Sequence, residues 1–118
     1  MNYELRYHWI SLLQPVFPAG TKFDVDPNTS DFRAEVRWKV GTDPDRPNKL
    51  SKTIIIIVPG ETENDYANKN DARRQSDDMK LLEFVESNFD IHDPDYDSLK
   101  GVKPPEVEWV AGSNVLNS

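Results

Sequence analysis

The sequence has 118 residues, with 14 lysine and arginine side chains against 21 aspartate and glutamate side chains, and no cysteine. This length suits one domain, and a hydrophobic content of 36% is enough for one modest core. The missing cysteine excludes disulfides, a thiol nucleophile and cysteine-ligated metal clusters. No run reaches the ~18 apolar residues of a membrane span, and no signal-peptide pattern opens the chain. We therefore expect a soluble cytoplasmic protein that does not bind membranes.

The N-terminal segment, residues 3–14, has the pattern of an amphipathic helix. Its apolar side chains recur at steps that place them on one helical stripe. They are Leu5, Trp9, Leu12 and Leu13. Pro15 lacks a backbone N–H and restricts the residue before it, so we expect the helix to end at Gln14.

Three strands are predicted next. Residues 22–26 alternate polar and apolar side chains before a turn-forming cluster at 27–30. Residues 32–40 continue the alternation, as in a strand with one buried and one wet face. Residues 53–58 are β-branched throughout, which favours a strand over a helix. The intervening residues 41–51 contain two prolines and are expected to form an exposed loop.

A second helix is predicted over residues 72–89, while the preceding residues 61–71 are open between helix and loop. Its apolar stripe consists of Met79, Leu82, Val85 and Phe89. We expect Asp77 and Asp78 to lie on or near the opposite, solvated face. A polar loop then leads to a short strand at residues 106–110.

These elements define the expected fold. The order helix, three strands, helix, strand predicts a two-layer α+β domain, with a mainly antiparallel sheet and the helices packed on it. Short links between consecutive strands favour an antiparallel meander. We expect a single domain over residues 1–112 and a mobile C-terminal tail over residues 113–118.

The isoleucine-rich strand conflicts with a sheet that is open to water on one side. Alternate residues of a strand point to opposite faces, and almost all residues of 53–58 are apolar. Burying each is worth ~1.5–3 kcal/mol, so both faces are expected to be covered. Loops, the C-terminal tail or helices on both faces are one solution. The other is a homodimer or partner interface, with Ile54, Ile56 and Val58 as contact residues.

Charge is unevenly distributed along the chain. Residues 1–60 carry 8 basic and 7 acidic side chains, whereas residues 61–118 carry 6 basic and 14 acidic ones. Direct binding of nucleic acid or of an anionic membrane by the acidic half is disfavoured, since both need cations. The acidic face of the second helix either serves solubility or binds a basic partner. Its candidate partner-binding residues are Asp77, Asp78, Glu83, Glu86 and Asp90.

The nearest match to a metal site is an acidic turn after the second helix. Asp93, Asp95 and Asp97 stand at alternate positions, as in the first half of a calcium-binding EF-hand loop. The rest of that pattern is absent, because Ser98 replaces the turn glycine and Pro104 replaces the closing glutamate. A solvated turn is the simpler interpretation.

No sequence pattern points to catalysis or to a cofactor. The five glycines are isolated, so there is no phosphate-binding loop, and the serines lack a nucleophile-elbow motif. His8 and His92 are too far apart in sequence to indicate a zinc site. Trp9, Trp38 and Trp109 fall on the inward faces of three elements, which indicates a shared core or a ligand pocket that they line.

We therefore expect a small non-enzymatic interaction or accessory module. Its partner is a protein or a second copy of the chain, bound at the acidic helix or at the isoleucine strand. Two other functions stay open. One is an acidic inhibitor or nucleic-acid mimic that binds a basic protein, and the other is a calcium- or small-ligand-binding domain.

Overall fold

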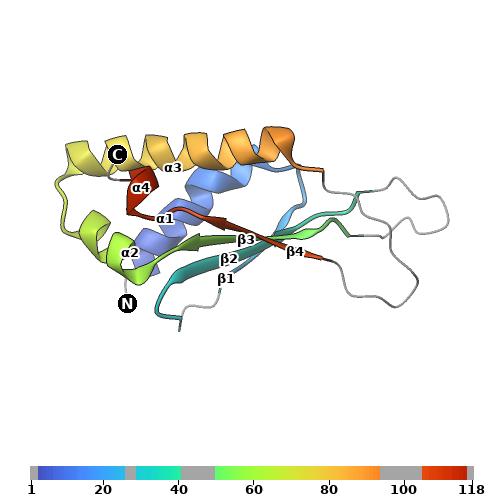
Figure 1. Cartoon of the computed structure of the whole chain (residues 1–118), viewed down its shortest axis with the longest axis horizontal. Helices are drawn as coiled ribbons and strands as arrows, with labels where there is room; N and C mark the ends of the chain where they lie inside the picture. Colours follow the sequence, from blue (N-terminus) through green and yellow to red (C-terminus); the bar gives the residue numbers. More distant parts are fainter. Residues whose placement is uncertain (1–2, 26–28, 41–49, 94–104, 117–118) are drawn as a thin grey trace.

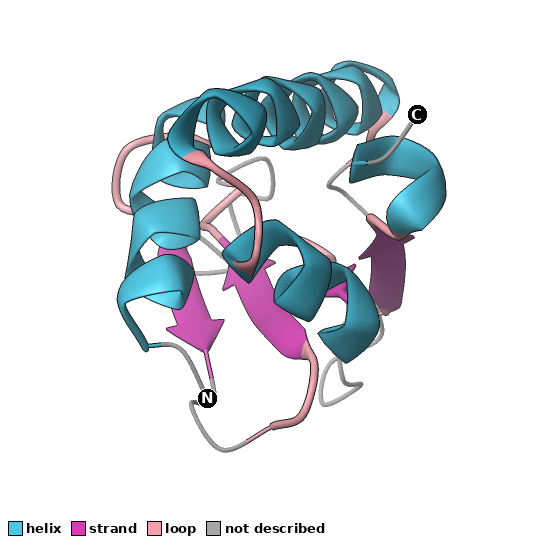
Figure 2. Cartoon of the chain, turned by 90° about the vertical axis from the view of Figure 1, so that its left-hand side faces the viewer, coloured by secondary structure: helices cyan, strands magenta, loops and turns pink. Residues whose placement is uncertain are grey.

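A four-stranded sheet with a layer of helices on one face makes up the structure, a computed structural model that describes residues 3–25, 29–40, 50–93 and 105–116 (Figure 1). In chain order the elements are α1 (Tyr3–Leu13), the 3-10 turn η1 (Gln14–Val16), β1 (Lys22–Val25), β2 (Phe32–Arg37), β3 (Thr53–Val58), α2 (Gly60–Ala67), α3 (Asp71–Ile91), β4 (Glu106–Val110) and α4 (Ser113–Leu116). Figure 2 shows the helices together on one side of the strands. The expected two-layer α+β fold and its element order are confirmed.

The sheet order is β1-β2-β3-β4, and all neighbouring strands are antiparallel except the last pair. β1 with β2 and β2 with β3 form antiparallel pairs. β4 is parallel to β3, with Ile56 beside Trp109 in the register. The meander therefore holds for three strands only. Helices α2 and α3 separate β3 from β4 in the chain, and such a crossover brings the last strand back parallel to its neighbour.

The second helical region is divided into α2 and α3. Residues 68–70 separate them, so the undecided stretch 61–71 is helix up to Ala67, a short link, and the first residue of α3. The side chain of Asn70 accepts a hydrogen bond from the backbone N–H of Arg73 at 2.9 Å. Asparagine is a favoured N-cap residue because its side chain satisfies one of the free N–H groups in the first helical turn. Asn70 therefore starts a new helix rather than continuing the old one.

The strand predicted over residues 32–40 is shorter in the structure and ends at Arg37. After it, Trp38 N–H donates to the side chain of Ser51 at 3.1 Å, and Lys39 forms only an isolated bridge with Leu50. The alternating pattern continues past Arg37, but the regular ladder to β3 does not.

The C-terminal segment differs from the mobile tail that the sequence predicts. Residues 113–116 form α4, which contacts α3, and Leu116 is 1% exposed within the main hydrophobic core. Burial of Leu116 stabilises the packing of α4 on the core, since moving a large aliphatic side chain out of water is favourable by about 1.5–3 kcal/mol.

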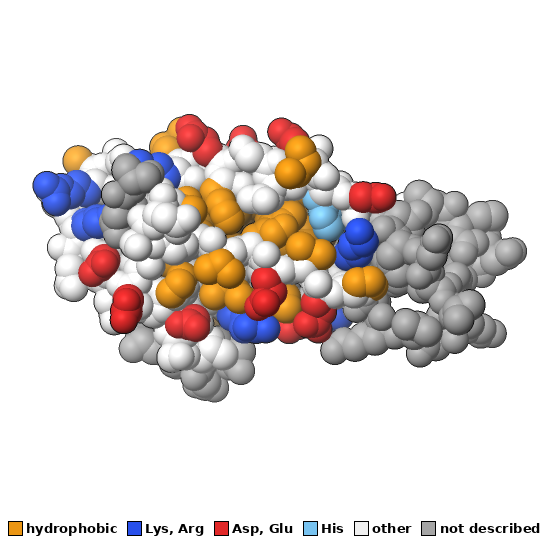
Figure 3. All heavy atoms as spheres, in the orientation of Figure 1, with side chains coloured by type: hydrophobic (Ala, Val, Ile, Leu, Met, Phe, Trp, Pro, Cys, Tyr) orange, Lys and Arg blue, Asp and Glu red, His pale blue; other side chains and the backbone are white. Residues whose placement is uncertain are grey.

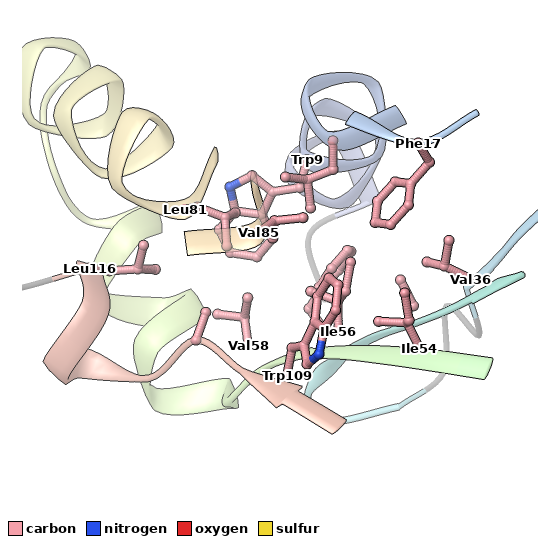
Figure 4. Packing of buried hydrophobic residues seen from close by; sticks show 14 of the residues in the cluster. Trp9, Phe17, Val36, Ile54, Ile56, Val58, Leu81, Val85, Trp109 and Leu116 are labelled. Carbon is pink, nitrogen blue, oxygen red and sulfur yellow. The ribbon is translucent and has the colours of Figure 1, made fainter. Parts of the chain in front are cut away.

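The core lies between the sheet and the helices, where Figure 4 shows Trp9 and Trp109. Trp38 belongs to the same core. Trp9 of α1 packs edge-on against Phe32 of β2, with ring centroids 5.2 Å apart. Trp38 and Trp109 both pack on Phe17, which follows η1. The prediction of a shared tryptophan core is confirmed.

The sheet face without helices buries its isoleucines by other means. Ile55 and Ile57 of β3 point to this face, yet they are 1% and 9% exposed. In the register, Ile55 lies between Glu35 of β2 and Glu108 of β4. We infer that side chains of the neighbouring strands cover these isoleucines, because the methylene groups of charged side chains can shield apolar surface while their heads stay in water. This face therefore offers a partner no exposed isoleucine.

Candidate functional site

Helix α3 has a buried side and an outer side, set by its 3.6-residue period. Leu81 and Val85 are fully buried against the core. Met79, which the sequence places on the apolar stripe, is 55% exposed, so that part of the prediction is wrong. The buried stripe begins instead at Asp77, which lies one turn before Leu81.

Asp77 is the first predicted contact residue that the structure removes from the surface. Its side chain is 5% exposed, and Lys69 Nζ donates to its Oδ2 at 2.6 Å. A buried carboxylate needs a paired charge, and the loop between α2 and α3 supplies it. The prediction that Asp77 lies on a solvated helix face is therefore wrong.

Asp78 joins three helices rather than facing solvent. Tyr66 of α2 donates its hydroxyl to Asp78 Oδ1 at 2.7 Å, and His8 Nε2 of α1 lies 2.8 Å from Asp78 Oδ2. Burial raises the pKa of the Tyr66 phenol, and the hydrogen bond to Asp78 raises it further. The phenol therefore stays protonated as a donor, and Asp78 is a packing contact, not a free carboxylate.

The remaining predicted acidic residues lie on the outer side of α3. Glu83, Glu86 and Asp90 are all exposed. Their spacing of three and four residues aligns them in one row along the helix. Within the described part of the chain, none of the three forms an ion pair.

Two residues of this row border a groove of about 490 Å³ between α3 and the α1–η1 segment. The apolar lining consists of Leu12, Pro15, Val16, Leu82 and Phe89, and the acidic lining of Glu86 and Asp90. The groove thus combines apolar walls with carboxylates that no described side chain neutralises. We call it the α1/α3 groove.

Sequence reasoning missed the α1–η1 wall of this groove. The sequence places Leu12 on the buried stripe of the first helix, but it is only partly buried. The available signal was the width of the apolar arc on α3. The apolar arc of α3 includes Leu81, Leu82 and Val85. It is wider around the helix than packing on the sheet alone requires, which implies that a second apolar surface lies beside α3.

The isoleucine strand does not supply the alternative contact surface. Ile54, Ile56 and Val58 are each 0% exposed and point into the core beneath the helices (Figure 4). The prediction that they form a partner interface is wrong, because the helix layer already covers them.

His92 closes an aromatic cluster at the end of α3. Its ring packs edge-on against Trp38 and Trp109, with centroids 6.2 and 5.6 Å away. Burial lowers the pKa of His92, and the charge of Lys52 lowers it further. The site favours the neutral imidazole. The tryptophans here pack on other rings, which agrees with the core interpretation rather than with a ligand pocket.

The predicted calcium site lies mostly outside the described residues. Asp93 is described and exposed, whereas Asp95 and Asp97 are not described. In the parts of the chain that the structure describes, no three histidine or carboxylate side chains gather as a metal site would require.

Comparisons with family models, curated proteins and solved structures gave no match. Over the described ranges, none of the helices combines the length and apolar character needed to cross a bilayer.

Proposed function

We propose that this chain is a non-enzymatic protein-interaction module that binds a basic amphipathic segment of another protein in the α1/α3 groove. The observation that carries the proposal is the combination of apolar walls with a row of carboxylates along the same helix that pair with no side chain in the described ranges. Apolar side chains of the partner occupy the groove, and its lysine or arginine side chains lie against the row.

The apolar walls supply the affinity. Leu12 and Val16 on one side and Leu82 and Phe89 on the other are only partly buried in the free chain. A partner that covers them removes apolar surface from water, which is the main favourable term in protein association. The helix-in-groove mode of peptide recognition uses this kind of surface.

The acidic row supplies the specificity. Glu83, Glu86 and Asp90 carry charge that no described side chain neutralises, on a protein with a net charge of −7. Complementary charge accelerates encounter and disfavours acidic partners. Basic residues beside the apolar ones are therefore part of the partner's description.

An acidic inhibitor or nucleic-acid mimic is the alternative. It requires a long array of exposed carboxylates. Asp77 and Asp78 are engaged inside the helix layer, so three acidic residues of the predicted five stay in the row. A short row beside an apolar groove fits a peptide better than it fits the charge pattern of a duplex.

A titration with designed peptides tests the proposal. The probe is an amphipathic helical peptide of leucine and lysine, and its matched control is the same peptide with glutamate for lysine. Binding is followed by NMR shifts of the groove residues. The lysine peptide is expected to shift Leu12, Val16, Leu82 and Phe89, and the glutamate peptide to leave them unchanged.

Charge reversal provides the second half of the test. The double variant Glu86→Lys/Asp90→Lys is expected to weaken binding of the lysine peptide about tenfold or more, which corresponds to ~1.4 kcal/mol. The control variant Glu61→Lys/Asp65→Lys changes the net charge equally at exposed positions of α2. If both double variants lose the same affinity for the lysine peptide, the effect is non-specific charge attraction and the proposal is wrong.

A further inference from the structure

β4 is an edge strand with backbone groups directed away from the sheet. It pairs with β3 on one side, and among the described residues no strand pairs with it on the other. Directly after the strand, Ala111 N–H donates to Ile57 C=O at 2.8 Å. Since bonding direction alternates along a strand, the N–H and C=O groups of Val110 and Glu108 point away from β3.

The two residues that carry these outward groups are exposed. Val110 is 49% exposed, and Glu108 is also exposed. Neither residue has a hydrogen-bond or ion-pair partner on this side within the described chain. An edge with free N–H and C=O groups is a template for another strand, and several recognition domains bind extended peptides in this way.

Hydrophobic side chains gather beside this edge, between α3 and β4 (Figure 3). Phe84 and Ile91, seven residues apart on α3, lie on the side of the helix that faces away from the α1/α3 groove. Phe84 is partly buried, and Ile91 is 86% exposed. Val107 of β4 is also only partly buried. The helix side of the edge is therefore apolar.

The other side of the edge is acidic. Glu108 points to the sheet face without helices, where the register places it beside Ile55. It forms no ion pair with a described residue. An added strand would alternate its side chains between these two environments, one apolar under α3 and one acidic beside Glu108.

We propose that the outer edge of β4 accepts an extended segment of another protein in which lysine or arginine alternates with apolar residues. The segment hydrogen-bonds to Glu108 and Val110. Its basic side chains lie beside the Glu108 carboxylate, and its apolar side chains lie beside Val107 below α3. This surface is separate from the α1/α3 groove and does not depend on the function proposed above.

A second copy of the chain fits this edge less well. A symmetric antiparallel pair that uses all five residues of β4 is centred on Glu108 and places it opposite Glu108 of the second copy. Like charges directly opposite each other destabilise a strand pair. Each copy also carries a net charge of −7. A basic segment removes both penalties.

Amide hydrogen exchange followed by NMR tests the proposal. The probe is a short peptide of alternating lysine and valine, and the control peptide alternates glutamate and valine. The lysine peptide is expected to slow exchange of the Glu108 and Val110 amides about tenfold or more. The Trp109 amide points toward β3 and serves as the internal control, with little change.

Two variants sharpen the result. Val110→Pro removes an outward N–H without removing a bond to β3, and proline is tolerated on edge strands for that reason. It is expected to abolish the protection of Glu108 by the peptide. Glu108→Lys is expected to weaken peptide binding several-fold more than Glu61→Lys does at an exposed position of α2.

Four outcomes overturn the proposal. One is an absence of protection at saturating peptide, and another is equal protection by the glutamate peptide. The third is a dimer in sedimentation whose Glu108 and Val110 amides are protected without peptide, which would make a second copy the occupant. Binding that is lost in Glu86→Lys/Asp90→Lys and kept in Glu108→Lys would likewise place the peptide in the groove.

Discussion

Arg6 of α1 and Glu63 of α2 form a doubly hydrogen-bonded ion pair, although 57 residues separate them. The distances are 2.9 Å from Nε to Oε2 and 3.0 Å from Nη2 to Oε1. The two side chains are 4% and 7% exposed. Arg6 also donates to the carbonyl oxygen of Thr29 at 3.0 Å, so the pair links both helices to the segment before β2.

Removing one partner of this pair should be strongly destabilising. Arg6→Met leaves the Glu63 carboxylate buried without its charge partner, and we expect a loss of ~3–5 kcal/mol in the free energy of unfolding. The double variant Arg6→Met/Glu63→Met should lose much less, because no charge stays buried. Urea denaturation of the three proteins measures the difference. A double variant as unstable as the single one would contradict this account.

The hydroxyl of Tyr66 should contribute to stability through Asp78. Tyr66→Phe removes a hydrogen bond to a carboxylate, and we expect a loss of about 1–3 kcal/mol. Tyr7→Phe, at a residue that is 70% exposed, is the matched control and should change stability little. Thermal or urea unfolding distinguishes the two variants. Equal losses of stability in Tyr66→Phe and Tyr7→Phe would show that the hydrogen bond to Asp78 is not the cause.

His92 should make the protein less stable as the pH falls below neutral. Its pKa is lower in the folded state than its ordinary value of 6.5, so the unfolded state binds the proton more readily. Stability from this group is present above pH 6.5 and is lost as the pH falls toward the folded pKa. His92→Phe retains an aromatic ring and should show a smaller stability difference between pH 7.5 and pH 5.5 than the parent chain. An unchanged difference would assign the pH dependence to other groups.

The stripe predicted from the sequence contains Met79, whereas the stripe that the structure buries contains Leu81. The two stripes predict opposite effects on stability when these residues are replaced by alanine. Leu81 is fully buried, so Leu81→Ala should cost about 2–5 kcal/mol. Met79 is 55% exposed, and Met79→Ala should stay within about 0.5 kcal/mol of the parent. Chemical denaturation compares the pair. A larger loss of unfolding free energy in Met79→Ala than in Leu81→Ala would support the stripe predicted from the sequence.

Local patterns predicted the elements well because each pattern needs only neighbouring residues. The alternation that begins at Phe32 and the β-branched run from Thr53 to Val58 both gave strands where expected. The helix stripe was harder to assign. Leu81 and Leu82 are adjacent, so the sequence permits two overlapping stripes, and only packing against the sheet selects one.

The site was harder to predict because its residues depend on distant partners. Asp77 and Asp78 carry the same side chain as Asp90 but have different environments. Lys69, Tyr66 and His8 turn the first two inward, and none of these contacts has a signature in the local sequence. The direction of β4 was also not readable, since it depends on the path of two helices rather than on the residues of the strand.

The parallel pairing of β3 with β4 also bears on how the chain folds. β1, β2 and β3 are neighbours in sequence and can pair early, whereas the pairing of β4 with β3 must close a loop that contains α2 and α3, so we expect it to form later. Until then, one edge of β3 is uncovered. β3 has the sequence Thr-Ile-Ile-Ile-Ile-Val, which is uncharged and β-branched throughout. Segments of this composition tend to form intermolecular β-sheets when they are exposed. We therefore expect self-association to be most frequent before β4 docks, because β4 covers this edge of β3 in the folded chain.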